Sequence, residues 1–175
     1  MERLTSAKIE FCTSEPLGET NLYPLRFEPL FRRCLWGGRR LGTVLNKPIG
    51  PGEDYAESWE IVDHGPDQSV VAFGELRGIQ LGQLVAAYGR ELFGRHRPQR
   101  QFPLLFKFLD ANQALSVQVH PDDRQAAQLD PPDLGKTEAW VVIQADPGSV
   151  IYAGLREGVD RETLQAAMAA GRTES

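Results

Sequence analysis

The stretch Leu115-Ser116-Val117-Gln118-Val119-His120 decides how this chain folds. Its odd-numbered positions are apolar and its even-numbered positions are polar, an alternation that predicts a β-strand with one buried face. The apolar face is expected to pack into a sheet or core, and the Ser, Gln and His side chains are expected to line a polar surface. Pro121-Asp122-Asp123 follows, ends the strand and caps a short helix at about 124–129.

A second strand with the same alternation is predicted from Lys136 to Gln144. Lys136, Glu138 and Trp140 share one of its faces, so Glu138 can meet the polar face of the first strand if the two strands are neighbours. Shorter strands are predicted on either side, at 104–109 and 150–153.

The rest of the chain adds further short elements. In chain order they are an extended segment at 23–33, strands at 56–62 and 69–73 joined by a turn at 64–67, a helix at 79–92 that ends at Gly94, and a helix at 161–170 that is capped by Asp160. The pattern predicts a mainly β protein with a few short helices.

Gln118, His120 and Glu138 are the candidate ligands of a metal ion. Imidazole, carboxylate and amide oxygen donors together suit a borderline metal such as Zn²⁺. The residues also allow a simpler interpretation, in which His120 is a hydrogen-bonded structural residue and Glu138 pairs with Lys136 or Lys107. Alternation alone leaves both interpretations open.

Composition excludes several classes of protein. With 175 residues, 41% hydrophobic and 25% charged, the chain has the size and balance of one soluble globular domain. The net charge of -5 argues against a nucleic-acid-binding protein, and no apolar run approaches the ~20 residues of a membrane span. The first eleven residues lack the apolar core of a signal peptide. Cys12 and Cys34 are expected to be the reduced thiols of a cytoplasmic protein, although one disulfide between them stays possible.

Several ordered motifs resemble one known family. The segments Phe102 to Ala111, Leu115 to Asp123 and Gly135 to Trp140 are closely similar to segments of the type I mannose-6-phosphate isomerase (phosphomannose isomerase) family. Trp36-Gly37-Gly38, Glu57-Ser58-Trp59-Glu60 and Tyr152-Ala153-Gly154-Leu155 also stand where that family has like segments. The resemblance runs from about Tyr23 to Gly171.

The resemblance implies a fold and a set of site residues. The implied fold is a cupin-like (jelly-roll) β-sandwich, here incomplete. Residues 1–22 would be a lead-in segment, 23–155 the N-terminal part of the catalytic domain, and 156–175 the start of a helical insertion. By position, Gln118, His120 and Glu138 would bind one Zn²⁺. Lys107, Ser116 and Lys136 would contact the substrate, and Lys136 is also the implied catalytic acid or base.

The implied activity is the interconversion of mannose 6-phosphate and fructose 6-phosphate, an isomerisation of carbohydrate metabolism. A base would remove a proton next to the carbonyl, a cis-enediol would form, and the proton would return to the neighbouring carbon. The expected partner is a small sugar phosphate, with neither nucleic acid nor membrane.

The chain also departs from the family pattern. The family's fourth zinc ligand, a downstream histidine, and a catalytic arginine beyond it have no counterpart here, because His64 and His96 both precede the Gln118–His120 stretch and are expected in loops. A non-catalytic cupin-like module that binds a sugar phosphate or a metal is therefore the alternative hypothesis. Unpaired strand edges would favour self-association or pairing with a partner that supplies the missing strands.

Overall fold

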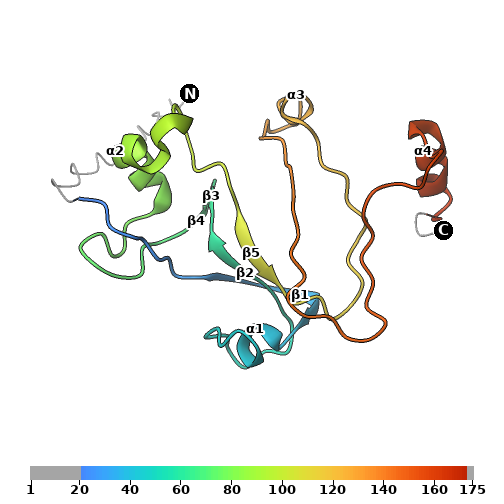
Figure 1. Cartoon of the computed structure of the whole chain (residues 1–175), viewed down its shortest axis with the longest axis horizontal. Helices are drawn as coiled ribbons and strands as arrows, with labels where there is room; N and C mark the ends of the chain where they lie inside the picture. Colours follow the sequence, from blue (N-terminus) through green and yellow to red (C-terminus); the bar gives the residue numbers. More distant parts are fainter. Residues whose placement is uncertain (1–20, 173–175) are drawn as a thin grey trace, which may run out of the picture. The chain divides into compact units, whose positions relative to one another are not determined.

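The computed structural model describes residues 21–172. Residues 1–20 and 173–175 lie outside this range, and with them Cys12 and most of the predicted lead-in segment. The chain divides into two compact units, Met1–Ala114 and Leu115–Ser175, whose helices and strands are labelled in Figure 1. The boundaries predicted after residues 22 and 155 separate the lead-in segment, the catalytic domain and the helical insertion of the family. They stay predictions.

The first unit is built on a three-stranded antiparallel sheet. Its strands are β1 (Leu30–Gly38), β2 (Tyr55–Ile61) and β5 (Phe106–Leu109), in the order β1-β2-β5. Trp59 of β2 lies opposite Leu30 of β1 on one side and Lys107 of β5 on the other. The predicted strands at 56–62 and 104–109 are confirmed, since each overlaps β2 or β5 along most of its length.

A buried carboxylate ties the end of β5 to the rest of this sheet. Asp110 is only 6% exposed, and its Oδ2 accepts a hydrogen bond from the backbone N–H of Arg40, 2.7 Å away, at the start of helix α1 (Arg40–Thr43). The backbone N–H of Asp110 donates to the carbonyl of Ala56. A Cβ at Gly38 would lie 2.7 Å from Asp110 Oδ2, so this approach requires glycine at the end of β1.

A short hairpin follows the sheet. It consists of β3 (Asp63–His64) and β4 (Asp67–Gln68), with Gly65 at φ +53° in the turn, as the sequence predicts. The predicted strand at 69–73 was wrong. Its residues form only isolated bridges, Phe27 with Val71 and Val70 with Gln80, because the backbone pairs with two different segments instead of one continuous neighbour.

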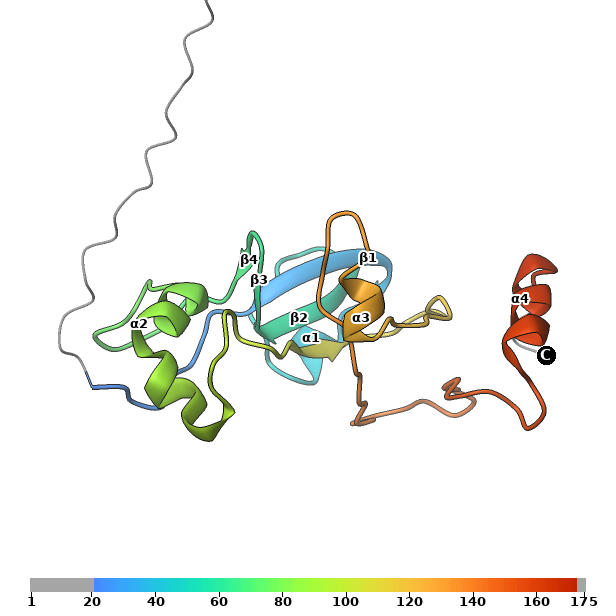
Figure 2. The ribbon, with the colours of Figure 1, turned by 90° about the horizontal axis from the view of Figure 1, so that it is seen from above.

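Helix α2 (Leu81–Phe93) closes the core of the first unit and confirms the predicted helix. Leu84 is fully buried and packs with Val71 and Leu76. The helix bends at Tyr88, where φ is −122° (Figure 2). Gly94, at φ +47°, ends it and begins the short 3₁₀ helix η1 (Gly94–His96).

In its described residues, 115–172, the second unit contains two short helices, α3 (Asp123–Ala126) and α4 (Arg161–Ala169). Each begins at an aspartate whose side chain accepts a hydrogen bond from a backbone N–H in the first turn. Asp122 accepts from Gln125 and Asp160 accepts from Thr163, both at 2.8 Å. Both predicted caps are confirmed.

The strands predicted at 115–120, 136–144 and 150–153 are not formed as strands (Figure 1). In the part of the chain that the structure describes, no backbone hydrogen bond joins 137–145 to another segment. A strand exists only as part of a hydrogen-bonded ladder, and alternation of side chains does not supply the neighbour. The described fold is therefore mixed, with small antiparallel sheets and few helices.

Candidate metal and substrate site

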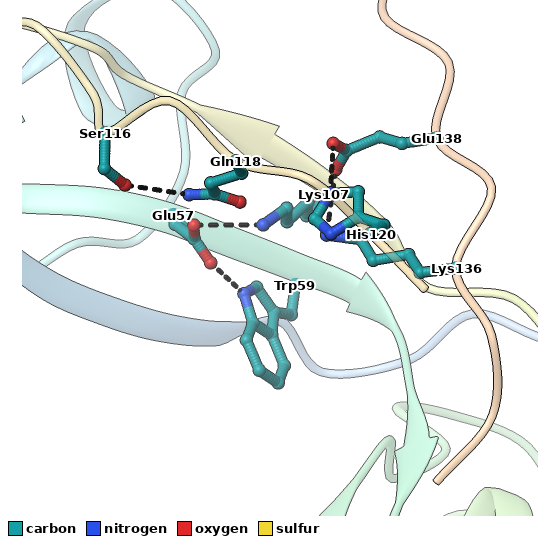
Figure 3. A network of polar contacts seen from close by, with 8 residues as sticks. All are labelled: Glu57, Trp59, Lys107, Ser116, Gln118, His120, Lys136 and Glu138. Carbon is teal, nitrogen blue, oxygen red and sulfur yellow. Dashed lines mark hydrogen bonds and ion pairs between the residues drawn. The ribbon is translucent and has the colours of Figure 1, made fainter. Parts of the chain in front are cut away.

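His120 and Glu138 lie side by side in the second unit. His120 Nε2 is 3.2 Å from Glu138 Oε2, and the two side chains are 23% and 26% exposed (Figure 3). The alternation predicted that these two residues, eighteen positions apart, could meet if their strands were neighbours. The two side chains are in contact although neither segment belongs to a regular strand.

A close backbone approach brings these two residues together. The backbone N–H of Lys136 donates to the carbonyl of Pro121 at 3.1 Å, and that of Gly135 donates to Asp123 Oδ1 at the same distance. A Cβ at Gly135 would collide with the backbone of Asp123. Gly135 is thus the residue that lets the segment before Glu138 pack against the turn that follows His120.

The carboxylate of Glu138 uses its two oxygens for different partners. Oε2 faces His120, whereas Oε1 is 3.2 Å from Nζ of Lys136. Partial burial works to raise the pKa of Glu138. Hydrogen bonds from the side chains of Trp140, Lys136 and His120, together with the positive charge of Lys136, outweigh it and lower this pKa to about 2. Glu138 is therefore ionised at neutral pH, as a metal ligand must be.

Gln118 lies in the same unit, but its hydrogen bond is with another residue. Its Nε2 donates to Oγ of Ser116 at 3.2 Å, which leaves the amide oxygen on the side away from Ser116 (Figure 3). Among residues 21–172 no hydrogen bond joins Gln118 to His120 or Glu138. The structure thus brings together two of the three predicted ligands, His120 and Glu138. The third, Gln118, lies two residues before His120 in the chain.

The separation of two donor atoms, on His120 and Glu138, is one that a zinc ion could bridge. Zinc–nitrogen and zinc–oxygen bonds of about 2.0–2.2 Å at near-tetrahedral angles place two donor atoms roughly 3.2–3.5 Å apart. The 3.2 Å between His120 Nε2 and Glu138 Oε2 meets this requirement. Within the described part of the chain no group of three His, Cys, Asp or Glu residues could hold a metal. A third protein donor would therefore have to come from another residue type. The amide oxygen of Gln118 is a donor of this kind.

Lys107, the remaining predicted substrate residue, belongs to the first unit. Its Nζ is 3.1 Å from Oε1 of Glu57, and the two side chains are 21% and 15% exposed. The indole Nε1–H of Trp59 donates to the other oxygen of Glu57 (Figure 3). The guanidinium of Arg32 stacks 4.4 Å above the Trp59 ring.

The ion pair of Glu57 with Lys107 was not predicted from the sequence. Glu57 lies two residues before Trp59 on β2, and Trp59 is the cross-strand partner of Lys107. Glu57 and Lys107 therefore share a face of the sheet. The available signal was the alternation within Glu57-Ser58-Trp59-Glu60, but it indicates nothing about Lys107 until the register of β2 and β5 is known.

The two other histidines belong to the first unit. His64 ends β3 in the hairpin, and His96 belongs to η1, where its Nε2 accepts a hydrogen bond from Nε of Arg95 at 3.3 Å. The expectation that both histidines lie in loops was therefore wrong, because His64 belongs to a strand and His96 to a 3₁₀ helix. No helix among the described residues is long and apolar enough to cross a membrane.

The chain is similar to known proteins over most of its length. Residues 25–147 match the family description "Phosphomannose isomerase type I, catalytic domain". The mannose-6-phosphate isomerase of Streptococcus mutans is 43% identical over 148 residues, which are 85% of this chain and 45% of that protein. Mannose-6-phosphate isomerase ManA of Bacillus subtilis is 41% identical over 131 residues, 75% of this chain and 40% of that protein.

A solved structure is similar as well. The crystal structure of mannose 6-phosphate isomerase from Bacillus subtilis matches 64% of this chain and 35% of its own chain, with a TM-score of 0.58 and 37% identity. The chain spans less than half the length of the curated relatives it matches. The family match covers most of the chain, including all six predicted site residues. The chain belongs to the type I phosphomannose isomerase family.

Proposed function

We propose that this chain carries the metal-binding part of an isomerase that interconverts mannose 6-phosphate and fructose 6-phosphate. The observation that carries the proposal is the pairing of His120 and Glu138 at 3.2 Å in a chain of this family. The relatives named as mannose-6-phosphate isomerases supply the substrate. The proposed fold of the whole protein is a cupin-like jelly roll, in line with the Bacillus subtilis structure, and its proposed location is the cytoplasm.

His120, Glu138 and Gln118 are the proposed zinc ligands. A bound zinc ion supplies a Lewis acid that polarises a sugar oxygen. The ionised carboxylate of Glu138 provides the negative charge of the site, and the hydrogen bond to Ser116 fixes the orientation of the Gln118 amide.

Lys136 is the proposed residue for proton transfer. Aldose–ketose isomerisation moves a proton between neighbouring carbon atoms, so an acid or base must stand beside them. The ion pair with Glu138 orients Nζ of Lys136 next to the proposed metal ligands, while 42% of the side chain stays open to a substrate. In this pair Lys136 contributes a positive charge that would also attract an anionic sugar phosphate.

Ser116 and Lys107 are the remaining proposed substrate contacts. The hydroxyl of Ser116 can donate to a sugar hydroxyl or a phosphate oxygen while it accepts from Gln118. The ammonium of Lys107 is a cation of the type that binds phosphate, and Glu57 fixes its position.

The experiment is a coupled mannose 6-phosphate isomerase assay on the purified chain, together with its zinc content. One zinc per chain with turnover supports the proposed isomerase and excludes the non-catalytic module. One zinc per chain without turnover supports the module, in which the same residues bind metal or sugar phosphate. No zinc and no turnover would contradict catalysis by this polypeptide.

A further inference from the structure

A hollow lies in the first unit where helix α2 ends and the following loop begins. Gly89 and Phe93 line it from α2, and Arg95, Arg97 and Gln99 line it from η1 and the loop after it. Its volume is about 510 Å³, which is within the range of pockets that bind small molecules. Two arginines and no acidic side chain line the hollow, so it suits an anion.

The positive charge extends beyond the lining of the hollow. Between Leu92 and Phe102 the sequence has Arg95, Arg97 and Arg100 and no acidic residue, in a chain whose net charge is -5. All three arginines are exposed. Within the described residues 21–172 none of them forms an ion pair with a carboxylate. This part of the chain therefore leaves their charges without a counter-charge.

Stabilisation of the helix end accounts for only a small part of this charge. The C-terminus of α2 carries roughly half a negative charge from its peptide dipoles. Arg97 already serves this end, because its Nε donates to the carbonyl of Gly94 at 3.0 Å. Arg95 and Arg100 add positive charge that the helix end does not require.

The two arginines of the hollow are each held at Nε and open at their terminal nitrogens. Nε of Arg97 donates to the carbonyl of Gly94, and Nε of Arg95 donates to Nε2 of His96 at 3.3 Å. In the described part of the chain the terminal nitrogens of both guanidinium groups form no hydrogen bond. A side chain whose orientation is already fixed loses less freedom on binding, and guanidinium N–H groups match the oxygens of a phosphate.

Size and charge favour a small phosphate ester over a polyanion. Nucleic acids bind to extended basic surfaces of proteins with a positive excess, whereas these arginines lie between residues 95 and 100 of an acidic chain. A phosphate monoester carries about 1.5 to 2 negative charges at neutral pH, which two guanidinium groups can balance. Phe93, only 8% exposed, gives the hollow an apolar wall for the organic part of such a molecule.

We propose that this hollow binds a phosphate monoester of a small organic molecule, and that Arg95 and Arg97 hold its phosphate group. The hollow contains none of the residues proposed above for zinc binding, substrate contact or proton transfer. The proposal is therefore independent of the isomerase reaction and adds a second ligand site to the chain.

The probe is glycerol 3-phosphate, added to the full ¹⁵N-labelled chain and followed by NMR of the arginine Nε–H signals. We expect the signals of Arg95 and Arg97 to shift and to reach saturation. Inorganic phosphate should compete, because it carries the same charged group. Glycerol, which lacks the phosphate, should cause no shift.

Two substitutions test the two parts of the hollow. Arg97→Gln should weaken binding about tenfold, because it removes a charge-assisted contact. Arg77→Gln, at an exposed arginine of the first unit outside the hollow, removes the same charge and should leave binding unchanged. Gly89→Leu should abolish binding by filling the hollow. A Cβ at Gly89 would lie 3.9 Å from Cδ2 of Phe93, an ordinary contact, and leucine favours a helix more than glycine does, so this variant should fold.

Four results would overturn the proposal. One is that the Nε–H signals of Arg95 and Arg97 do not respond to glycerol 3-phosphate. Another is that Arg97→Gln and Arg77→Gln weaken binding equally, which would indicate general attraction by charge. The third is that Gly89→Leu binds as tightly as the wild-type chain, which would exclude the hollow as the site. The last is that a DNA duplex shifts these signals and glycerol 3-phosphate does not, because the ligand would then be a polyanion.

Discussion

Glu138 is the residue on which the candidate site depends, because its two carboxylate oxygens hold His120 and Lys136 at 3.2 Å each. Its pKa of about 2 lies below the ordinary value of 4.5. A depressed carboxyl pKa stabilises the native arrangement at pH values above 4.5, and this contribution is lost as the pH falls from 4.5 towards 2.

This titration can be measured directly. We expect the carboxyl ¹³C resonance of Glu138 to titrate near pH 2 in the wild-type chain. Lys136→Met should raise the pKa of Glu138, because it removes a hydrogen bond and a positive charge. Lys47→Met, which breaks the ion pair with Glu60 in the first unit, should leave the pKa of Glu138 unchanged. If the carboxyl of Glu138 in the wild-type chain titrated with a midpoint near pH 4.5, this would contradict its contacts with His120 and Lys136.

Asp110 is the residue that fixes the end of β5. Asp110→Ala should lower the free energy of unfolding by about 1–3 kcal/mol, because the backbone N–H of Arg40 loses its acceptor and a buried polar contact is removed. Urea denaturation followed by circular dichroism measures this free energy of unfolding. Glu75→Ala, at an exposed carboxylate of the same unit, is the control. Equal effects of the two substitutions would exclude a stabilising role for Asp110.

Among the elements, α2 makes the central contribution to the core of the first unit. Leu84 is fully buried, and Leu84→Ala should cost about 2–5 kcal/mol of unfolding free energy through lost apolar contacts and a cavity. Glu91→Ala, on the exposed side of the same helix, should change it by less than about 0.5 kcal/mol. Thermal and urea unfolding of the two variants provide the comparison. A cost for Leu84→Ala no larger than that for Glu91→Ala would mean that α2 does not pack as described.

The elements also show how far sequence could predict this structure. Helix α2 was predictable because its apolar spacing and the terminating Gly94 act locally. The strands at 115–120 and 136–144 were not formed, because alternation specifies two faces and a ladder needs a neighbouring backbone. At the site, the shared faces allowed a contact of His120 with Glu138 if two strands were neighbours, and the contact forms without strand pairing. The ion pair of Glu57 with Lys107 depends on the register between β2 and β5, which no local pattern reveals.

For the molecule as a whole, we propose that the chain contributes Gln118, His120 and Glu138 to the zinc site of a type I phosphomannose isomerase. All three are expected to influence zinc affinity, and His120 most directly, since it is the only imidazole of the set. His96, which lies in η1 of the first unit, provides a matched histidine outside the site.

Zinc titration of the purified chain against a chromophoric chelator, with X-ray absorption of the bound metal, tests this claim most directly. We predict one zinc per chain, a first shell of nitrogen and oxygen at about 2.0–2.2 Å, loss of binding in His120→Ala and Glu138→Ala, and unchanged binding in His96→Ala. Absence of zinc from the wild-type chain, a sulfur ligand at about 2.3 Å, or equal affinity of His120→Ala and His96→Ala would contradict it.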